Sequence, residues 1–113
     1  MAITRTQLIE VAQPLDAIYE ICLGAAEAVP HAYLKDANED NGTITLKVPM
    51  SVKSWGERVV LQLNEVGPSA TSVEVMSKAS FPLTFTDYGK NAQNVQRIVD
   101  WLARAHPSRG EDE

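Results

Sequence analysis

The chain has little of what metal sites and nucleophilic active sites are built from. Its 113 residues include one cysteine and two histidines. A single cysteine cannot form an internal disulfide, and Cys22 lies in an apolar helical stretch, so we expect a buried core residue and no nucleophile. A zinc site lacks ligands in such a chain, because the histidines are not spaced as a metal-binding pair. We therefore expect no metal and no cofactor.

Motifs that would identify a catalytic centre are also missing. The sequence has no glycine-rich nucleotide loop of either common type and no Gly-x-Ser-x-Gly elbow. We assign no catalytic residue and expect a protein that is not an enzyme. One alternative stays open, in which Glu57, Asp87 and Lys90 converge in one concave site and act as acid and base groups.

Concentrated positive charge and long apolar runs are absent as well. The formal net charge is −5, and the ten basic residues are scattered along the chain. An acidic surface repels nucleic-acid phosphates, so no nucleic-acid partner is expected. No segment reaches the length needed to cross a bilayer, and no signal-like leader opens the sequence. We expect a cytoplasmic protein without membrane insertion.

Hydrophobic periodicity predicts six secondary-structure elements. Alternating apolar residues favour strands, whereas spacings of three and four favour helices. A proline and an acidic residue, Pro14 and Asp16, suit the start of the first helix. Thr86 or Asp87 is expected to cap the last helix, whose apolar stripe begins at Val95. We read residues 30–42 as a polar connector. The predicted strands are 3–11, 43–48, 57–65 and 70–78, and the predicted helices are 15–29 and the segment from about 87 to 105.

This order, β-α-β-β-β-α, predicts an α+β two-layer sandwich. Short, turn-like connectors between the later strands favour antiparallel pairing. We expect a mostly antiparallel four-stranded sheet with both helices on one face. Residues 1–106 are predicted to form a single domain, and residues 107–113 a flexible C-terminal tail.

Two compact motifs stand out at element boundaries. Trp-Gly-Glu at residues 55–57 precedes a predicted strand, and Asp-Tyr-Gly-Lys-Asn at residues 87–91 opens the last helix. A structural interpretation has Trp55 closing the core and Asp87 capping the helix. A functional interpretation has the helix start and Lys90 binding an anion, or Trp55 lining a ligand site. The candidate ligand-binding residues are Trp55, Glu57, Asp87, Tyr88, Lys90 and Asn91.

These two motifs, with Phe81-Pro82 and the amphipathic helix, resemble a small uncharacterised bacterial domain family. That resemblance covers about residues 3–105 and implies a fold without implying any chemistry. The chain more weakly resembles START/Bet v 1-like ligand-binding domains, which also begin with a strand and a proline-containing helix and end with a long helix. The chain is shorter than those domains, and a large lipid cavity is not expected from it.

Two functions from different classes follow from these features. The first is a non-enzymatic binding or interaction module that forms a homodimer or binds another protein. It is motivated by Val60 and Met76 on the otherwise polar sheet face. The second is a small carrier that binds an apolar or anionic ligand between the sheet and the last helix, near Trp55, Tyr88 and Lys90.

Overall fold

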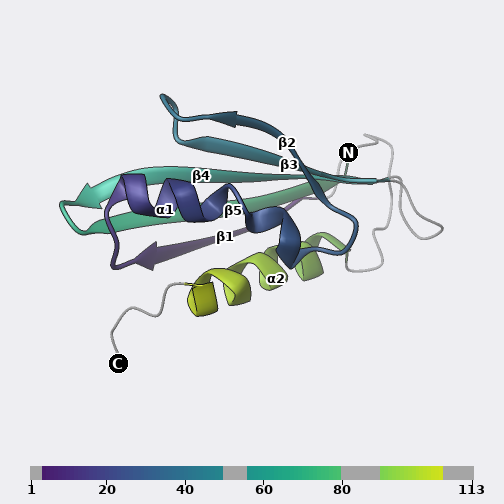
Figure 1. The fold of residues 1–113 in the computed structure, drawn as a ribbon. Helices are drawn as coiled ribbons and strands as arrows, with labels where there is room; N and C mark the ends of the chain where they lie inside the picture. Colours follow the sequence, from purple (N-terminus) through teal and green to yellow (C-terminus); the bar gives the residue numbers. More distant parts are fainter. Residues whose placement is uncertain (1–3, 50–55, 80–89, 106–113) are drawn as a thin grey trace.

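The computed structural model describes residues 4–49, 56–79 and 90–105 (Figure 1). The chain begins with strand β1 (Thr4–Val11), helix α1 (Leu15–Cys22) and a 3-10 helix, η1 (Ala25–Ala28). Strands β2 (Tyr33–Asn38), β3 (Thr43–Val48), β4 (Glu57–Gly67) and β5 (Ala70–Ala79) follow. Helix α2 (Lys90–Ala105) ends the described part of the chain.

The strands form one sheet in the order β1-β5-β4-β3-β2, and every neighbouring pair is antiparallel. The prediction of an antiparallel α+β sheet is confirmed, but the predicted number of four strands is wrong, because the sheet has five. The missed strand, β2, is exposed along its whole length and therefore lacks the alternation of buried and exposed residues that identifies a strand.

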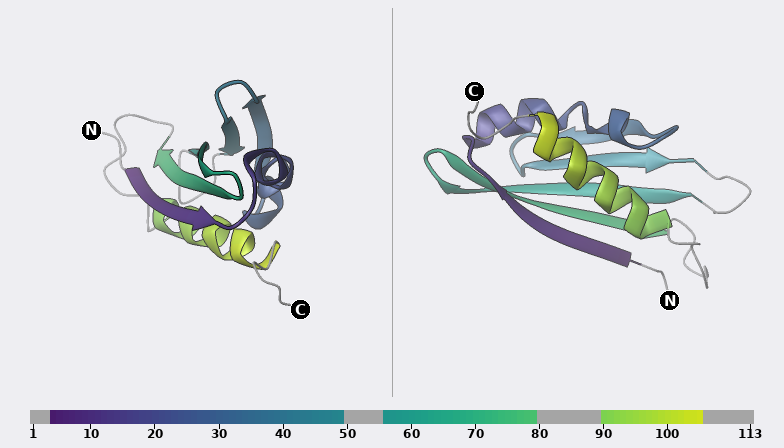
Figure 2. Two further views of the ribbon diagram at one scale, coloured as in Figure 1. Left: turned by 90° about the vertical axis from the view of Figure 1, so that its left-hand side faces the viewer. Right: turned by 90° about the horizontal axis from the view of Figure 1, so that it is seen from below.

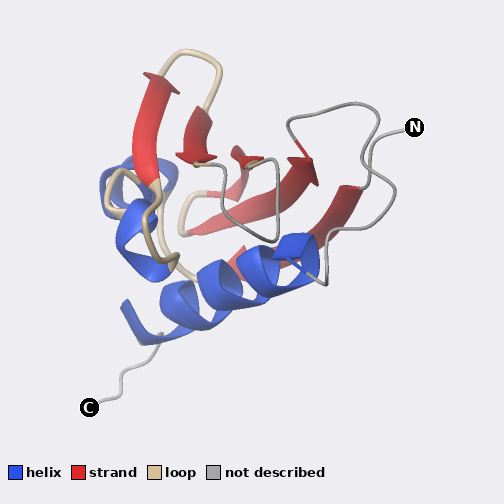
Figure 3. Cartoon of the chain, turned by 90° about the vertical axis from the view of Figure 1, so that its right-hand side faces the viewer, coloured by secondary structure: helices blue, strands red, loops and turns tan. Residues whose placement is uncertain are grey.

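The helices pack on one face of this sheet (Figures 2 and 3). Helix α2 crosses β5 and β1 and contacts η1, whereas α1 lies on β4 and β5. Every second residue of β4 and β5 points toward the helices, as the alternation of each strand requires. The buried side chains form one hydrophobic cluster that includes Ile18, Cys22, Ile44, Leu46, Val59, Leu61, Val73, Val75, Ile98 and Leu102.

The first predicted helix, residues 15–29, is divided in two in the structure. Helix α1 ends at Cys22, with Leu23 as its C-cap, and a short 3-10 turn follows after Gly24. The apolar side chains of both pieces still reach the core, since Ile18, Cys22, Ala25 and Val29 are all buried. No helix in the described ranges is long and apolar enough to cross a membrane.

Candidate functional site

Four polar side chains are buried together between the sheet and the start of α2. Glu57 is 1% exposed, and Ser77, Asn91 and Asn94 are 0% exposed. Burying a polar side chain costs free energy unless it forms hydrogen bonds, so the presence of four of them within an apolar core needs an explanation. We refer to Glu57, Ser77, Asn91 and Asn94 as the buried polar cluster.

Strand pairing and helical periodicity bring these residues together. Strands β4 and β5 are antiparallel, so the first residues of β4 lie beside the last residues of β5, with Glu57 opposite Ala79 and Val59 opposite Ser77. Glu57 shares the inward face of β4 with the buried residue Val59. Asn91 and Asn94 are three residues apart in α2, so they lie on one helix face that points at these strands.

Hydrogen bonds connect the four side chains. The Ser77 hydroxyl donates to Asn91 Oδ1 at 2.6 Å. The Asn94 amide Nδ2 donates to Glu57 Oε1 at 3.1 Å and to Ser77 Oγ at 3.1 Å. The cluster thus links strands β4 and β5 to two positions of α2. Buried networks of this kind strengthen in a medium of low dielectric and fix the geometry of the elements that carry them.

One acceptor in this cluster has no partner. Asn94 Oδ1 is buried and accepts no hydrogen bond within the described residues. The amide is oriented with its nitrogen toward Glu57, whose side-chain oxygen accepts the hydrogen bond. The oxygen is left to accept from a group outside the cluster. A buried acceptor without a donor costs roughly 1–3 kcal/mol, which a bound donor would recover.

The cluster contains two of the six residues that the sequence suggested as ligand-binding. Glu57 and Asn91 both belong to it. Trp55, Asp87 and Tyr88 lie outside the described residues, as does the side chain of Lys90, the first residue of α2. The convergence of Glu57, Asp87 and Lys90 that an acid-base enzyme would need therefore remains an untested alternative.

Sequence reasoning missed the other two members of the cluster, Ser77 and Asn94. Both residues can be found from the helical spacing along α2 and the alternation along β5. Steps of four residues backward along the apolar stripe of α2 lead from Ile98 to Asn94 and from Val95 to Asn91. Continuing the inward-facing residues of β5 past Val75 reaches Ser77. A polar residue at a position that periodicity assigns to the core is the pattern to look for.

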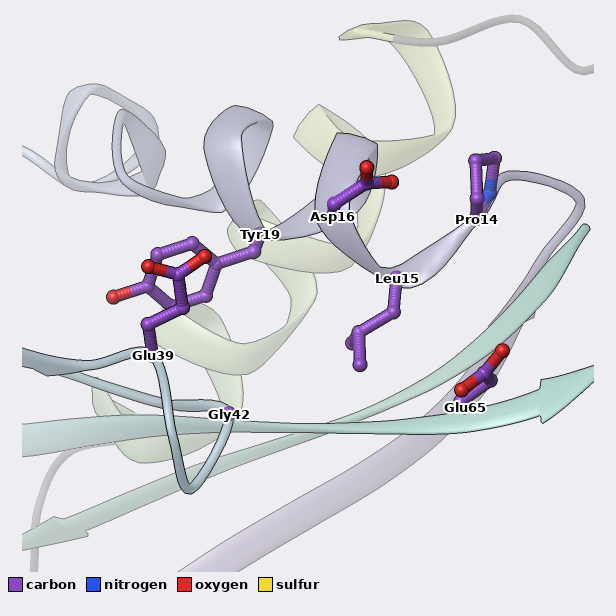
Figure 4. A pocket seen from close by; sticks show the side chains of 7 residues that line it. All are labelled: Pro14, Leu15, Asp16, Tyr19, Glu39, Gly42 and Glu65. Atoms are coloured by element: carbon purple, nitrogen blue, oxygen red, sulfur yellow. The ribbon is translucent and has the colours of Figure 1, made fainter. Parts of the chain in front are cut away.

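A pocket of about 420 Å³ lies at the opposite end of the sheet (Figure 4). It opens between the start of α1 and the turn that joins β2 to β3, above the far end of β4. In the described parts of the chain, no group of three histidine, cysteine, aspartate or glutamate side chains is close enough to hold a metal ion. The lining residues are Pro14, Leu15, Asp16, Tyr19, Glu39, Gly42 and Glu65.

The one cysteine is buried, as predicted. Cys22 is 0% exposed in the hydrophobic cluster and has a free thiol. Burial disfavours the thiolate and raises the pKa of Cys22 to about 12. A thiol with so high a pKa is a poor nucleophile near neutral pH, which agrees with a packing role for this residue.

The sequence matches no protein-family model and no curated protein sequence. The match of the two motifs to a bacterial domain family therefore stays a resemblance. Comparison with solved structures identifies the fold. A START superfamily protein from Mycobacterium smegmatis superposes with a TM-score of 0.62 at 11% identity, over 91% of this chain and 95% of that one. The fold is START-like.

Two enzymes share this START-like fold. Norcoclaurine synthase from Thalictrum flavum, in complex with dopamine and hydroxybenzaldehyde, superposes with a TM-score of 0.61 at 9% identity, covering 96% of this chain and 90% of its own. A Streptomyces aromatase/cyclase superposes with a TM-score of 0.52 at 10% identity, covering 97% of this chain and 99% of its own. At these identities the similarity concerns the fold, so function must be argued from the residues of this chain.

Proposed function

We propose that this START-like domain binds a small, largely apolar molecule that carries a hydrogen-bond donor, between the sheet and the start of α2. The observation that carries the proposal is the unpartnered, buried oxygen of Asn94. A hydroxyl or N–H group of a ligand would donate to it, while the apolar residues around the cluster would pack against the remainder of the molecule. The proposal includes no chemical step.

The position of the cluster in the sequence supports this assignment. Trp55 comes two residues before Glu57, and Tyr88 and Lys90 come shortly before Asn91. We propose that Trp55, Asp87, Tyr88 and Lys90 line the same site, because the segments that carry them lead directly into the strand and the helix that form the cluster. An aromatic residue beside a few polar groups is the usual composition of a small-molecule site.

The buried carboxylate helps to select the ligand class. Glu57 places a carboxylate in the cluster, and an anionic ligand group beside it would be repelled at low dielectric. Of the apolar and anionic ligands that the sequence left open, the cluster therefore favours an apolar molecule with a neutral donor. Norcoclaurine synthase, which shares the fold, was solved with two small aromatic molecules, dopamine and hydroxybenzaldehyde.

A matched pair of probes tests this function. 2-Naphthol and 2-methoxynaphthalene have the same ring system, but only naphthol can donate a hydrogen bond. We expect naphthol to bind about tenfold more tightly, since a donor that satisfies a buried acceptor contributes roughly 1–3 kcal/mol. Titration followed by amide NMR should place the shifts at the start of β4 and at residues 91–95.

Variants of α2 provide the control for this experiment. Asn94→Leu removes the buried acceptor and should bring the two affinities close together. Gln96→Leu is the same kind of change at an exposed position of the same helix and should leave the tenfold ratio intact. Equal affinities for the two probes in the unmodified protein, or shifts confined to other regions, would show that Asn94 does not receive a ligand.

A second candidate function is self-association through the outer face of the sheet. Met76 lies opposite Val60 on β4 and opposite Thr6 on β1, and Leu8 is its diagonal neighbour on β1. Leu8 is 65% exposed, and Val60 and Met76 are half-buried. The three occupy neighbouring positions on the outer face of the sheet, and this apolar stripe favours the homodimer among the interaction partners that the sequence suggested.

A further inference from the structure

The pocket between α1 and the turn joining β2 to β3 has one apolar wall and an acidic rim. Leu15 and the ring of Tyr19 form the apolar wall, and Leu15 points toward the sheet (Figure 4). Asp16, Glu39 and Glu65 provide three carboxylates, and no lining residue in the described structure is basic. Its volume, about 420 Å³, lies in the range of pockets that hold small molecules.

Tyr19 contributes an aromatic ring and a hydroxyl group to this pocket. Its side chain is only 7% exposed, and it lines the pocket. In the described structure its hydroxyl is not among the buried atoms without a partner, so a bound molecule can reach this group, which can both donate and accept a hydrogen bond. Tyr19 faces Glu39 at one end of the pocket, and Glu65 lines the other end (Figure 4).

The charges around Tyr19 agree with a site for a positive group. The pKa of the Tyr19 hydroxyl is raised, first by its loss of hydration and then by the carboxylates of Glu39, Glu20, Asp36 and Asp40. The phenol therefore stays neutral at physiological pH and keeps its lone pairs available to a donor. The same carboxylates give the pocket a negative potential that attracts cations.

The turn that carries Glu39 is fixed in place by the neighbouring strand. Gly42 has a φ of 68°, and its carbonyl oxygen accepts a hydrogen bond of 2.8 Å from the backbone N–H of Leu63. The backbone N–H of Gly42 donates in turn to the carbonyl oxygen of Glu39 at 3.2 Å. In addition, Gln62 Nε2 donates to the carbonyl oxygen of Asn41 at 2.8 Å. These contacts fix the backbone at Glu39 relative to β4.

We infer that this pocket is a second binding site, separate from the buried polar cluster, and that it takes a small organic cation. The ammonium group of such a molecule would lie between the carboxylate of Glu39 and the hydroxyl of Tyr19, with its apolar body over Leu15 and toward Glu65. Charge attraction, a hydrogen bond to the phenol and contact with the aromatic ring would act together. A metal ion does not fit, since the described carboxylates are not grouped as metal ligands.

Phenethylamine and 2-phenylethanol test this inference, because they have similar size and differ in charge. We expect phenethylamine to bind at least about fivefold more tightly and to shift the amide signals of residues 15–19, 39–42 and 65. Glu39→Gln should weaken phenethylamine binding about two- to fivefold and leave phenylethanol binding unchanged. Tyr19→Phe keeps the ring, removes the hydroxyl and should also weaken phenethylamine binding.

Glu74→Gln is the matched control, since it removes the same charge from an exposed position on the outer face of β5. It should leave the affinity for phenethylamine unchanged. Equal binding of the two probes, or equal weakening by Glu39→Gln and Glu74→Gln, would overturn the inference. Asn94→Leu separates the two sites: it should abolish the preference for naphthol over its ether and leave phenethylamine binding at Glu39 intact.

Discussion

At the scale of single residues, the backbone geometry of Gly42 leads to a prediction about stability. A Cβ at this position would lie 2.6 Å from the carbonyl oxygen of Leu63, and the φ of 68° disfavours any residue with a side chain. Gly42→Ala should lower the free energy of unfolding by about 1–3 kcal/mol. Urea denaturation measures this as a lower midpoint at an unchanged slope.

Gly67→Ala is the control for that experiment. A Cβ at Gly67 would meet its nearest neighbour, the Cβ of Ala70, at an ordinary 3.8 Å. This substitution should therefore change the free energy of unfolding by no more than about 0.5 kcal/mol. If both glycine variants lose the same stability, the close contact with Leu63 is not the reason for glycine at position 42.

Cys22 gives a prediction about chemical reactivity. A pKa of about 12 instead of 9.0 lowers the thiolate fraction at pH 8 about a thousandfold. Labelling of the native protein with a disulfide reagent should therefore be slow at pH 8 and rapid in guanidinium chloride. The thiol of the unfolded chain ionises at a lower pH than the thiol of the folded protein. Ionisation of Cys22 therefore lowers the free energy of unfolding as the pH rises from about 9 toward 12. Rapid labelling without denaturant would contradict burial of this thiol.

The candidate site could be predicted only in part from single residues. Glu57 and Asn91 were suggested because they stand in compact motifs with glycine and an aromatic residue. Asn94 was missed, because the helical spacing of apolar residues identifies the buried face of a helix but does not mark a polar residue on that face. The pocket at Tyr19 was missed for a different reason. It depends on the position of the β2–β3 turn relative to α1, and this is a long-range arrangement that local patterns do not contain.

At the scale of elements, alternation along a strand was the most reliable signal. The bounds predicted for residues 43–48 are those of β3, and the alternating apolar residues Val59, Leu61 and Leu63 of β4 are buried. Strand β2 was missed because all six of its residues are exposed and a register shift between Leu34 and Asp36 interrupts its pairing with β3. An edge strand of this kind is held by its neighbour's backbone, and its own sequence need not alternate.

The two faces of β4 should respond differently to truncation. Leu61 is fully buried under the helices, whereas its neighbour Val60 is half-buried on the outer face. Leu61→Ala should lower the free energy of unfolding by about 2–5 kcal/mol, because it leaves a cavity in the core. Val60→Ala should cost about 1 kcal/mol or less. Similar losses for both variants would mean that the outer face is also covered in solution.

At the scale of the whole molecule, the two proposed sites lie at opposite ends of one sheet. The buried polar cluster is at the start of β4, and the pocket between α1 and the turn joining β2 to β3 is near its far end, at Glu65. Between them lies the single hydrophobic cluster that joins residues of both helices and of the strands. Because the core separates the sites, a small ligand at one end has no direct contact with a ligand at the other, and we expect their affinities to be independent.

The outer face of the sheet gives the last prediction, which concerns the oligomeric state. In the part of the chain that the structure describes, the helices lie on the inner face, so we propose that the stripe formed by Leu8, Met76 and Val60 packs against a second copy. Three side chains make a small apolar centre compared with stable dimer interfaces, and the net charge of −5 opposes association. We therefore expect a weak dimer whose sedimentation coefficient rises with concentration in the micromolar range.

Two substitutions distinguish this dimer from unspecific association. Leu8→Lys places a charge in the stripe, where a second copy would bury it, and should make the protein monomeric at every concentration measured. Val66→Lys introduces the same charge at an apolar residue that is 53% exposed but lies outside the stripe, and should leave the association unchanged. If the unmodified protein sediments as a monomer throughout, the outer face does not mediate self-association, and small-ligand binding is the function that the structure supports.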